Sequence, residues 1–355
     1  MNKELTKSLY VHVPFCNTIC TYCDFKKQVY NSKLVDSYLI YLKETLKKDV
    51  KNYELETIYI GGGTPTSLNI NQLNELLLLL KPYSNNVIEY TIESNIENIN
   101  KELIDLLVSF GINRISLGVQ SLNSNLLKIM NRKHTKDDVF NALKIISDNK
   151  ITNITIDMMY GFNELSFETF LADLTTVCRC KLVKHISLYS LTVEKNTYLG
   201  KINYQTIDNY NEAKFYIEAK KILSKYKFEQ YEVSNFSKVG YQSLHNKCYW
   251  KYHNFYGVGK GASGKIDNIR YEDGGECVKL NTKDIIFETI MMNLRLVEGI
   301  NIKEFNERYT TNILDIYKEA INKHISLDNL IIDQGYLKTT EYGMLNLHDI
   351  LVDFL

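Results

Sequence analysis

The sequence is poor in proline, in tryptophan, in long apolar runs and in net charge. Its 355 residues include three prolines and one tryptophan, and 42 basic residues balance 42 acidic ones. A neutral chain has no global basic field that would attract nucleic acid. The longest purely aliphatic run, residues 76–80, is far too short to span a bilayer. We therefore predict no nucleic-acid partner and no transmembrane segment, whereas peripheral contact with a membrane stays compatible with the sequence.

The cysteines do not have the pattern of a disulfide framework. There are seven of them, an odd number, and the N-terminal residues 1–7 are too polar for a signal peptide. Disulfides persist in oxidising compartments, so a chain of this kind is expected in a reducing one. We predict a cytoplasmic protein.

Three cysteines near the N-terminus, Cys16, Cys20 and Cys23, form the motif Cys-x3-Cys-x2-Cys. A [4Fe–4S] cluster has one thiolate on each iron, so three thiolates would leave the fourth iron open to a small molecule. The amino and carboxylate groups of S-adenosylmethionine (SAM) can chelate that iron, and an electron from the cluster can then release a 5′-deoxyadenosyl radical. This spacing is similar to the signature of the radical SAM superfamily. Two alternatives are a zinc site completed by a residue such as His12, and chance clustering of buried cysteines.

Apolar segments of strand length alternate with amphipathic segments of helix length over the first two thirds of the chain. We predict strands at 8–13, 57–60, 88–93, 114–118, 154–158 and 185–191, separated by helices near 34–50, 70–80, 99–109, 136–149 and 167–178. This alternation is typical of parallel βα units. The sequence therefore predicts an α/β fold: an open, partial (βα)6 barrel over residues 1–225, followed by a smaller, mostly helical domain over residues 226–355.

Polar or glycine-rich groups follow the predicted strands, where a barrel carries its chemistry. The cysteines follow the first strand and the run Gly61-Gly62-Gly63-Thr64 follows the second, whereas Glu93, Gln120 and Asp157 end the third, fourth and fifth. Consecutive glycines allow a ligand to approach the backbone closely, although a plain tight turn would look the same. Carboxylates suit ribose hydroxyls or an ammonium group. A solvated surface position is the alternative for each single polar residue.

With these residues in view, the chain resembles the HemN/HemW group of radical SAM proteins along nearly its whole length. The resemblance lies in the motifs Tyr-Val-His-Val-Pro-Phe-Cys at 10–16, Gly-Gly-Gly-Thr-Pro-Thr at 61–66, Arg-Ile-Ser-Leu-Gly-Val-Gln-Ser at 114–121, His-Ile-Ser-Leu-Tyr-Ser-Leu-Thr at 185–192, Tyr-Glu-Val-Ser-Asn-Phe at 231–236 and His-Asn-Lys-Cys-Tyr-Trp at 245–250. It implies a radical SAM barrel with a HemN-type C-terminal domain, and a [4Fe–4S] cluster on Cys16, Cys20 and Cys23. It also implies SAM contacts at Tyr10, Gly62, Gly63, Thr64, Glu93, Gln120, Arg132 and Asp157.

Two functions compete within this group. The oxidase branch decarboxylates coproporphyrinogen III and carries a fourth cysteine two residues after the third, where this chain has Phe25; it also has a longer segment before the first strand. The other branch resembles haem chaperones, which implies haem, haem-acceptor proteins and His245 as a haem-binding residue. A hydrogen-bonded structural histidine beside Trp250 is the alternative for His245. In the chaperone branch, cluster and SAM need not turn over a substrate and could regulate haem transfer or homodimer formation.

A third alternative is an RNA-modifying radical SAM enzyme. Such enzymes usually carry an RNA-binding surface or an appended domain, and the neutral charge of this chain offers no evident basic stripe. We therefore expect the haem-chaperone function and keep the oxidase function as the alternative.

Overall fold

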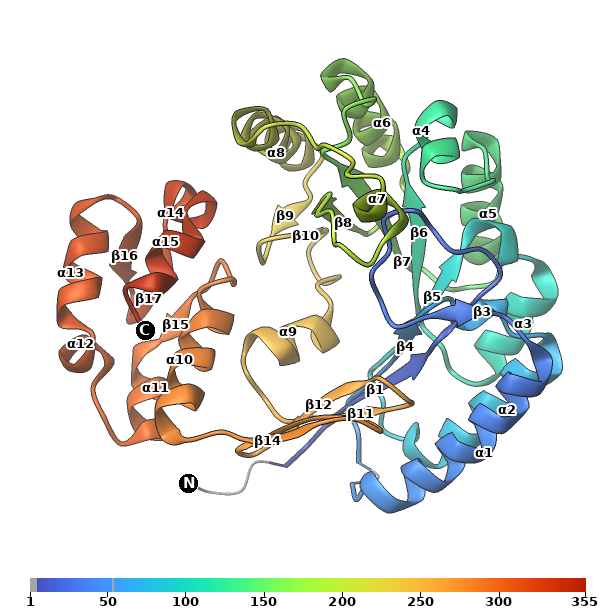
Figure 1. Cartoon of the computed structure of the whole chain (residues 1–355), viewed down its shortest axis with the longest axis horizontal. Coiled ribbons are helices and arrows are strands. Elements are labelled where there is room, and N and C mark those ends of the chain that lie inside the picture. Colours follow the sequence, from blue (N-terminus) through green and yellow to red (C-terminus); the bar gives the residue numbers. More distant parts are fainter. Residues whose placement is uncertain (1–4, 53) are drawn as a thin grey trace.

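The computed structural model describes residues 5–52 and 54–355 and is built around one twelve-stranded sheet (Figure 1). Six strands pair in parallel and in chain order, as β1-β4-β5-β6-β7-β8. They are β1 (Ser8–Val13), β4 (Thr57–Gly62), β5 (Glu89–Asn95), β6 (Arg114–Gln120), β7 (Asn153–Tyr160) and β8 (His185–Ser190). The predicted partial (βα)6 barrel is therefore confirmed.

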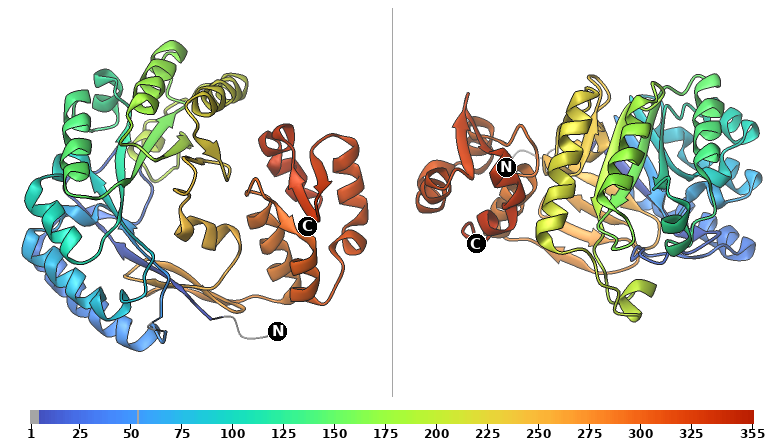
Figure 2. Two further views of the ribbon diagram at one scale, coloured as in Figure 1. Left: turned by 180° about the vertical axis from the view of Figure 1, so that it is seen from behind. Right: turned by 90° about the horizontal axis from the view of Figure 1, so that it is seen from above.

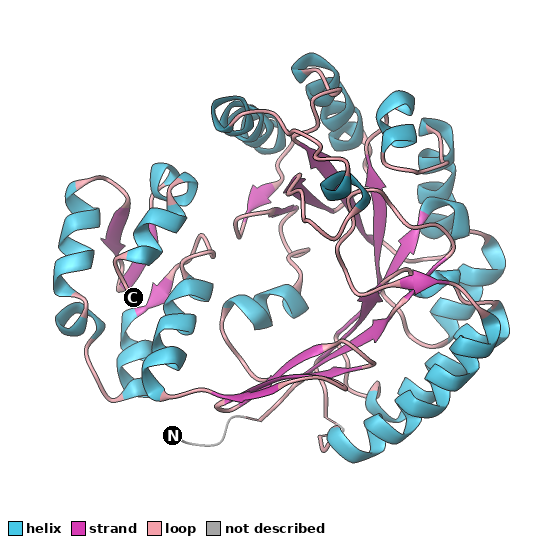
Figure 3. Cartoon of the chain, in the orientation of Figure 1, coloured by secondary structure: helices cyan, strands magenta, loops and turns pink. Residues whose placement is uncertain are grey.

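Helices cover the outer face of these strands, as the secondary-structure colouring makes clear (Figure 3). They are α1 (Ser32–Asp49), α2 (Ile70–Leu80), α3 (Lys101–Ser109), α4 (Ser124–Ile129), α5 (Lys136–Asp148), α6 (Phe167–Arg179) and α8 (Asn209–Lys225). The short helix α7 (Tyr198–Lys201) lies instead beside the cysteine loop, where the N–H of Leu199 donates to the carbonyl of Thr21 (Figure 1). Side-chain caps set where they begin: Asn31, Asn69 and Asn100 each accept a hydrogen bond from the first turn of the helix that follows. At α5, Thr135 and Asp138 form a reciprocal capping box.

The inner face of the barrel is polar although its strands are parallel. In β6, Ile115, Leu117 and Val119 are completely buried, whereas the alternate residues Arg114 and Ser116 line a cavity. Strands of parallel sheets usually read as continuous apolar runs because both of their faces are buried in apolar surroundings. Here successive side chains along each strand point alternately to the helix-covered outer face and to the lumen, which holds the functional groups.

Both edges of the six-stranded barrel are extended by segments beyond residue 225. Short antiparallel strands β10 (Asn235–Ser237) and β9 (Glu229–Gln230) extend β8, and β11 (Phe255–Val258) runs parallel to β1. A ribbon of β12 (Ser263–Ile266), β13 (Ile269–Glu272) and β14 (Cys277–Lys279) continues the sheet beyond β11. Between these two edges lies α9 (Leu244–Trp250), which packs against β4.

The last segment forms a second unit with its own hydrophobic core, set beside the barrel (Figure 2). It contains α10 (Thr282–Asn293), α11 (Ile302–Tyr309), α12 (Ile313–Ile316), α13 (Lys318–Ser326), α14 (Glu341–Leu345) and α15 (Leu347–Val352), with a small sheet of β15 (Ile300–Asn301), β17 (Tyr336–Thr339) and β16 (Leu330–Asp333). Its mostly helical character matches the prediction. The predicted boundary between the two domains, at 225/226, is different, because the strands at 229–279 pair with the larger sheet. We propose a boundary near residue 280.

Two further features concern the ends and surfaces of the chain. The polar segment 1–7, from which no signal peptide was predicted, lies partly outside the described residues. Among the helices that the structure describes, none has the length and apolar character needed to cross a membrane.

Candidate functional site

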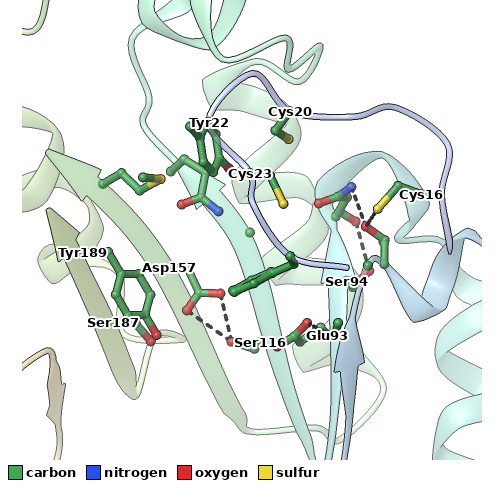
Figure 4. A pocket seen from close by; sticks show the side chains of 18 of the residues that line it. Cys16, Cys20, Tyr22, Cys23, Glu93, Ser94, Ser116, Asp157, Ser187 and Tyr189 are labelled. Carbon is green, nitrogen blue, oxygen red and sulfur yellow. Dashed lines mark hydrogen bonds between the residues drawn. The ribbon is translucent and has the colours of Figure 1, made fainter. Parts of the chain in front are cut away.

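A cavity of about 460 Å³ lies inside the barrel, between the cysteine-containing loop and strands β4 to β8. Figure 4 shows the three cysteine sulfurs on one side of it and the carboxylates of Glu93 and Asp157 on the other. The predicted cluster ligands and most of the predicted SAM contacts line this one cavity: Cys16, Cys20, Cys23, Gly62, Gly63, Thr64, Glu93, Gln120, Arg132 and Asp157. Tyr10 and His245 are not among its lining residues.

The cysteine loop is anchored at several points by hydrogen bonds to backbone groups. Its two ends meet in the short parallel pair β2 (Phe15–Cys16) and β3 (Gln28–Val29). Farther along, the Thr21 hydroxyl donates to the carbonyl of Ile129 at 2.8 Å, and the Asn131 amide donates to the carbonyl of Ile19 at 2.8 Å. The loop is therefore tied to the segment after α4, which also carries Arg132.

The three thiols have the chemistry that a metal-bound cluster requires. Burial raises the pKa of Cys16 to about 11 and also raises the pKa of Cys23. These two thiols therefore stay protonated near neutral pH until a metal displaces their protons. The Thr64 hydroxyl lies 3.6 Å from Cys16 Sγ and can donate to it.

The zinc alternative finds less support in the geometry. Both ring nitrogens of His12 are engaged: Nδ1 lies 2.9 Å from the Tyr10 hydroxyl, and Nε2 lies 2.8 Å from the carbonyl of Lys26. In the part of the chain that the structure describes, no three His, Cys, Asp or Glu side chains gather closely enough to hold a single metal ion. Three thiols without a fourth protein ligand fit a cluster with one open iron better than a closed zinc site.

The three glycines at the end of β4 are required by close packing and not only by a turn. A Cβ on Gly61 would lie 2.8 Å from the carboxyl carbon of Glu93, and one on Gly63 would lie 2.7 Å from the carbonyl of Phe15. Gly62 has a φ of +107°, and its Cβ would lie 2.4 Å from Nδ1 of His12. The glycines thus allow the loop after β4 to approach the start of the cysteine loop and the carboxylate of Glu93.

Two carboxylates face the lumen without a direct ion-pair partner among the described residues, although Arg132 and Arg114 act on Asp157 from a distance. Glu93 accepts hydrogen bonds from the Tyr59 hydroxyl at 2.8 Å and from the Gly62 N–H at 3.1 Å, and burial together with the nearby Asp157 leaves its pKa at about 7. Asp157 accepts from the Ser116 hydroxyl at 3.2 Å, and burial raises its pKa as well. Within the described residues neither carboxylate forms an ion pair. A cationic ligand would stabilise both charges, and SAM, with its sulfonium and ammonium groups, is such a ligand.

Gln120 and Arg132 complete the cavity wall. Gln120 adopts a left-handed φ of +66° at the end of β6, and its buried Oε1 has no hydrogen-bond partner among the described residues. A strained backbone and an unused buried acceptor are both typical of a ligand-binding position. Arg132 donates through Nη1 to the carbonyl of Gly118 at 2.6 Å and to Asn95 Oδ1 at 3.2 Å. The guanidinium is therefore fixed against the ends of β5 and β6.

Two predicted residues have other surroundings than the sequence suggested. Tyr10 hydrogen-bonds His12 behind the cavity wall and does not line the cavity. His245 is fully buried, and its Nδ1 and Nε2 each lie 2.7 Å from a hydroxyl, those of Thr57 and Tyr249. Burial lowers the pKa of His245 to about 3. These contacts favour the hydrogen-bonded structural role that was the alternative to haem ligation, and the haem-binding role of His245 stays a prediction.

The sequence analysis missed several lumen residues, namely Tyr22, Tyr59, Asn95, Arg114 and Ser116. The signal that could have found most of them is the period of two along the strands. Arg114 is the most informative: its Nη1 lies 3.6 Å from the buried carboxylate of Glu89, which also accepts the backbone N–H groups of Leu244 and His245 at the start of α9. The cavity wall and α9 are thus connected through one buried ion pair.

Comparisons with known proteins agree with this geometry. The family model described as the radical SAM superfamily matches residues 10–176, and that of the HemN C-terminal domain matches residues 280–345. A Lactococcus lactis protein named heme chaperone HemW is 33% identical over 95% of this chain and 94% of its own length. The Escherichia coli protein of that name is 30% identical over 98% of each chain. The solved structure of Escherichia coli coproporphyrinogen III oxidase (HemN), described as a radical SAM enzyme, shares the fold with a TM-score of 0.84 at 20% identity, covering 99% of this chain and 90% of that one.

Proposed function

Because the chain belongs to the HemW family of radical SAM proteins, we propose that it is a haem chaperone that binds haem and transfers it to acceptor proteins. The observation that carries the proposal is the similarity over nearly the full length to proteins named heme chaperone. The barrel cavity supports it, since the three cysteines and all of the proposed SAM-contacting residues except Tyr10 line it. We further propose a cytoplasmic location, with haem-acceptor proteins as partners.

The residues present fit a [4Fe–4S] cluster and SAM. Cys16, Cys20 and Cys23 would hold three irons, and SAM bound at the fourth would lie beside the unpaired carboxylates of Glu93 and Asp157. When bound, the cluster can supply an electron to SAM. The protein itself contributes an anchored loop that fixes the thiols, carboxylates that would accept hydrogen bonds from a cation, and the unused acceptor of Gln120.

The alternative function, oxygen-independent decarboxylation of coproporphyrinogen III, is disfavoured by Phe25. This side chain is 64% exposed and lines the cavity at the position where the oxidase branch carries its fourth cysteine. An exposed phenyl ring cannot ligate iron or transfer a proton. The similarity of the fold to the oxidase does not decide the matter, because one fold carries different functions.

The test is an anaerobic titration of the cluster-reconstituted protein with haemin, read by the Soret absorbance, followed by mixing with an apo-haem protein. We expect saturable binding of one haem per chain and transfer of that haem to the acceptor. In parallel, incubation with coproporphyrinogen III, SAM and a reductant should yield no decarboxylated product. Formation of that product, or the absence of haem binding, would refute the chaperone function.

A further inference from the structure

The barrel lumen also reaches residues that were not assigned to the cluster or to SAM. Three of them, called the amino-end group, are Arg114, His185 and Asn246. Arg114 and His185 are the first residues of β6 and β8, and Asn246 belongs to α9, whose start is hydrogen-bonded to Glu89, the first residue of β5 (Figure 1). A barrel carries its chemistry at the carboxyl ends of its strands, and polar residues at the amino ends usually serve stability. A polar group without a structural partner at this end therefore needs another explanation.

His185 is buried and its contacts define its tautomer. Its Nε2 lies 2.8 Å from the Tyr231 hydroxyl, whose oxygen also accepts the N–H of Ser243 at 3.3 Å. Among the described residues, the hydroxyl hydrogen of Tyr231 therefore finds its acceptor at His185 Nε2. Burial and the charge of Arg114 lower the pKa of His185 well below its usual range, so the ring is neutral. A neutral imidazole that accepts at Nε2 carries its proton on Nδ1.

The Nδ1–H of His185 is an unused donor in the wall of the lumen. Nδ1 is buried and has no hydrogen-bond partner among the described residues. Leaving a buried donor unpaired costs free energy, and buried donors in native proteins nearly always have a partner. Because His185 lines the lumen, we expect the missing partner to be a molecule inside it.

Asn246 supplies a second unused polar group. Its half-buried side chain lines the lumen and makes no hydrogen bond to another described residue, whereas its backbone N–H donates to Ser243 Oγ at 3.2 Å. The neighbouring His245 is engaged elsewhere, with its ring nitrogens 2.7 Å from the hydroxyls of Thr57 and Tyr249. Of these two adjacent motif residues, Asn246 is therefore the one that a molecule in the lumen can reach.

The charged member of the amino-end group is Arg114. Its guanidinium is held in place by hydrogen bonds to Asn153 Oδ1 at 3.2 Å, to the carbonyl of Tyr241 at 3.1 Å and to Thr155 Oγ1 at 2.9 Å. The carboxylate of Glu89 lies 3.6 Å from Nη1, but Glu89 is not among the residues that line the lumen. At this end the lumen therefore meets two donors and a positive charge. Charge-assisted hydrogen bonds to a carboxylate suit such a set.

We propose that the amino-end group binds the carboxylate of a molecule other than SAM, with His185 Nδ1 and the amide of Asn246 as donors and Arg114 as the facing charge. The carboxylate belongs either to a free small acid or to a side arm of a larger ligand, such as a propionate of haem. The proposal goes beyond the haem-chaperone function, because it stands whether or not the protein carries haem. It gives a role to His185 and Asn246, two motif residues that the cluster and SAM leave unexplained.

The experiment measures the binding of isotope-labelled acetate to the full-length, cluster-reconstituted protein by anaerobic NMR, with labelled histidine rings to observe His185. We expect saturable binding with a Kd on the order of 1 mM, which is usual for so small a ligand. The ring of His185 should carry its proton on Nδ1, and the Nδ1 signal should shift as acetate binds. Acetamide, which has the shape of acetate without its charge, should bind about tenfold more weakly.

Two leucine variants test the donor on α9. Asn246→Leu should weaken acetate binding about tenfold, because it removes one donor of a charge-assisted pair. Asn74→Leu should leave acetate binding unchanged, because Asn74 is a half-buried asparagine of α2 that does not line the lumen. His185→Phe should weaken binding and remove the acetate-dependent histidine signal; if this variant does not fold, the leucine pair still decides the proposal.

Competition identifies the source of the carboxylate. Haemin that displaces acetate, when its dimethyl ester does not, would support the site and assign it to a haem propionate. Acetate binding that haemin leaves unchanged would support the site and assign it to a free small acid.

Four results would overturn the proposal. Absence of acetate binding up to roughly ten times the expected Kd would mean that water satisfies these donors. Equal acetate affinity of wild type and Asn246→Leu would place the acetate elsewhere. A proton on Nε2 of His185 would contradict the donor assignment. Loss of acetate binding at saturating SAM would make the amino-end group part of the SAM site, whereas unchanged affinity would support a separate site.

Discussion

Replacement of Glu93 by glutamine should stabilise the protein without its cofactors while weakening its affinity for SAM. Glutamine has the shape of the protonated acid, and it can keep both hydrogen bonds: its carbonyl oxygen accepts from the N–H of Gly62, and its amide donates to the Tyr59 hydroxyl. What the substitution removes is the negative charge beside Asp157. Stability and SAM affinity change in opposite directions because the buried negative charge of Glu93 attracts the cationic SAM but destabilises the folded protein when SAM is absent.

The size of the effect follows from the pKa of Glu93, which burial raises from 4.5 to about 7. The folded-state value lies above the unfolded one, so the contribution of Glu93 to stability is fully present below its unfolded pKa and is lost as the pH rises through about 7. One pKa unit corresponds to 1.36 kcal/mol, so the wild type should lose about 2 to 3 kcal/mol relative to Glu93→Gln between pH 5 and pH 8. The side chain keeps part of its surface open to the cavity, which makes this figure an upper limit.

The assay is urea unfolding of the cofactor-free proteins at pH 5, 6.5 and 8, with SAM affinity of the reconstituted proteins measured in parallel. Other titrating groups are common to both proteins and cancel in the difference. A free-energy difference between wild type and variant that does not change with pH would refute the raised pKa. A variant with normal SAM affinity would refute the role of Glu93 at the SAM site.

Two further changes test the cysteine loop and the glycine run. Cys20→Ala should abolish cluster assembly, because two thiolates hold the cubane poorly; iron content and visible absorbance after reconstitution measure this, and unchanged iron would remove Cys20 as a ligand. Gly62→Ala should lower the free energy of unfolding by roughly 3 kcal/mol, because its new methyl group would meet the ring of His12, whereas Gly111→Ala, at a positive φ with no atom within 4 Å of its Cβ, should cost about 1 kcal/mol. Equal losses in thermal or urea unfolding would contradict the close-packing argument.

The sequence predicted those elements whose signals are local. The first strand and the helix at 70–80 agree with β1 and α2 at both ends, because a period of two and an Asn69 cap mark them without reference to the rest of the chain. The strands between 229 and 279 were missed because they are short, and because their pairing is distant: Tyr10 lies opposite Gly257. A glycine-rich segment with such a partner looks like a loop in the sequence.

The residues of the candidate site also divide into those with a local signal in the sequence and those without one. The cysteines, the glycines, Glu93 and Asp157 could be proposed because each lies near the carboxyl end of a predicted strand, the end at which a barrel carries its functional groups. Tyr59 and Arg114 lie within strands. The period of two assigns them to one face of a strand, but their neighbours in the lumen depend on the register between strands, which pairs Thr91 with Arg114. No local signal gives that register.

Replacement of His245 can act through the packing of α9, whether or not this histidine touches a ligand. At its start, Glu89 accepts three hydrogen bonds from Ser243, Leu244 and His245, and the carboxylate is balanced by Arg114 in the cavity wall. Removing one partner of such a buried network leaves an uncompensated charge or dipole, at a cost of several kcal/mol. His245 adds two hydroxyl contacts in the same interior, so its replacement should loosen the helix as a whole. Loss of haem binding in a His245 variant would therefore have two explanations, the loss of a haem ligand or the loosening of α9, and the axial-ligand spectrum of the haem-bound variant separates them.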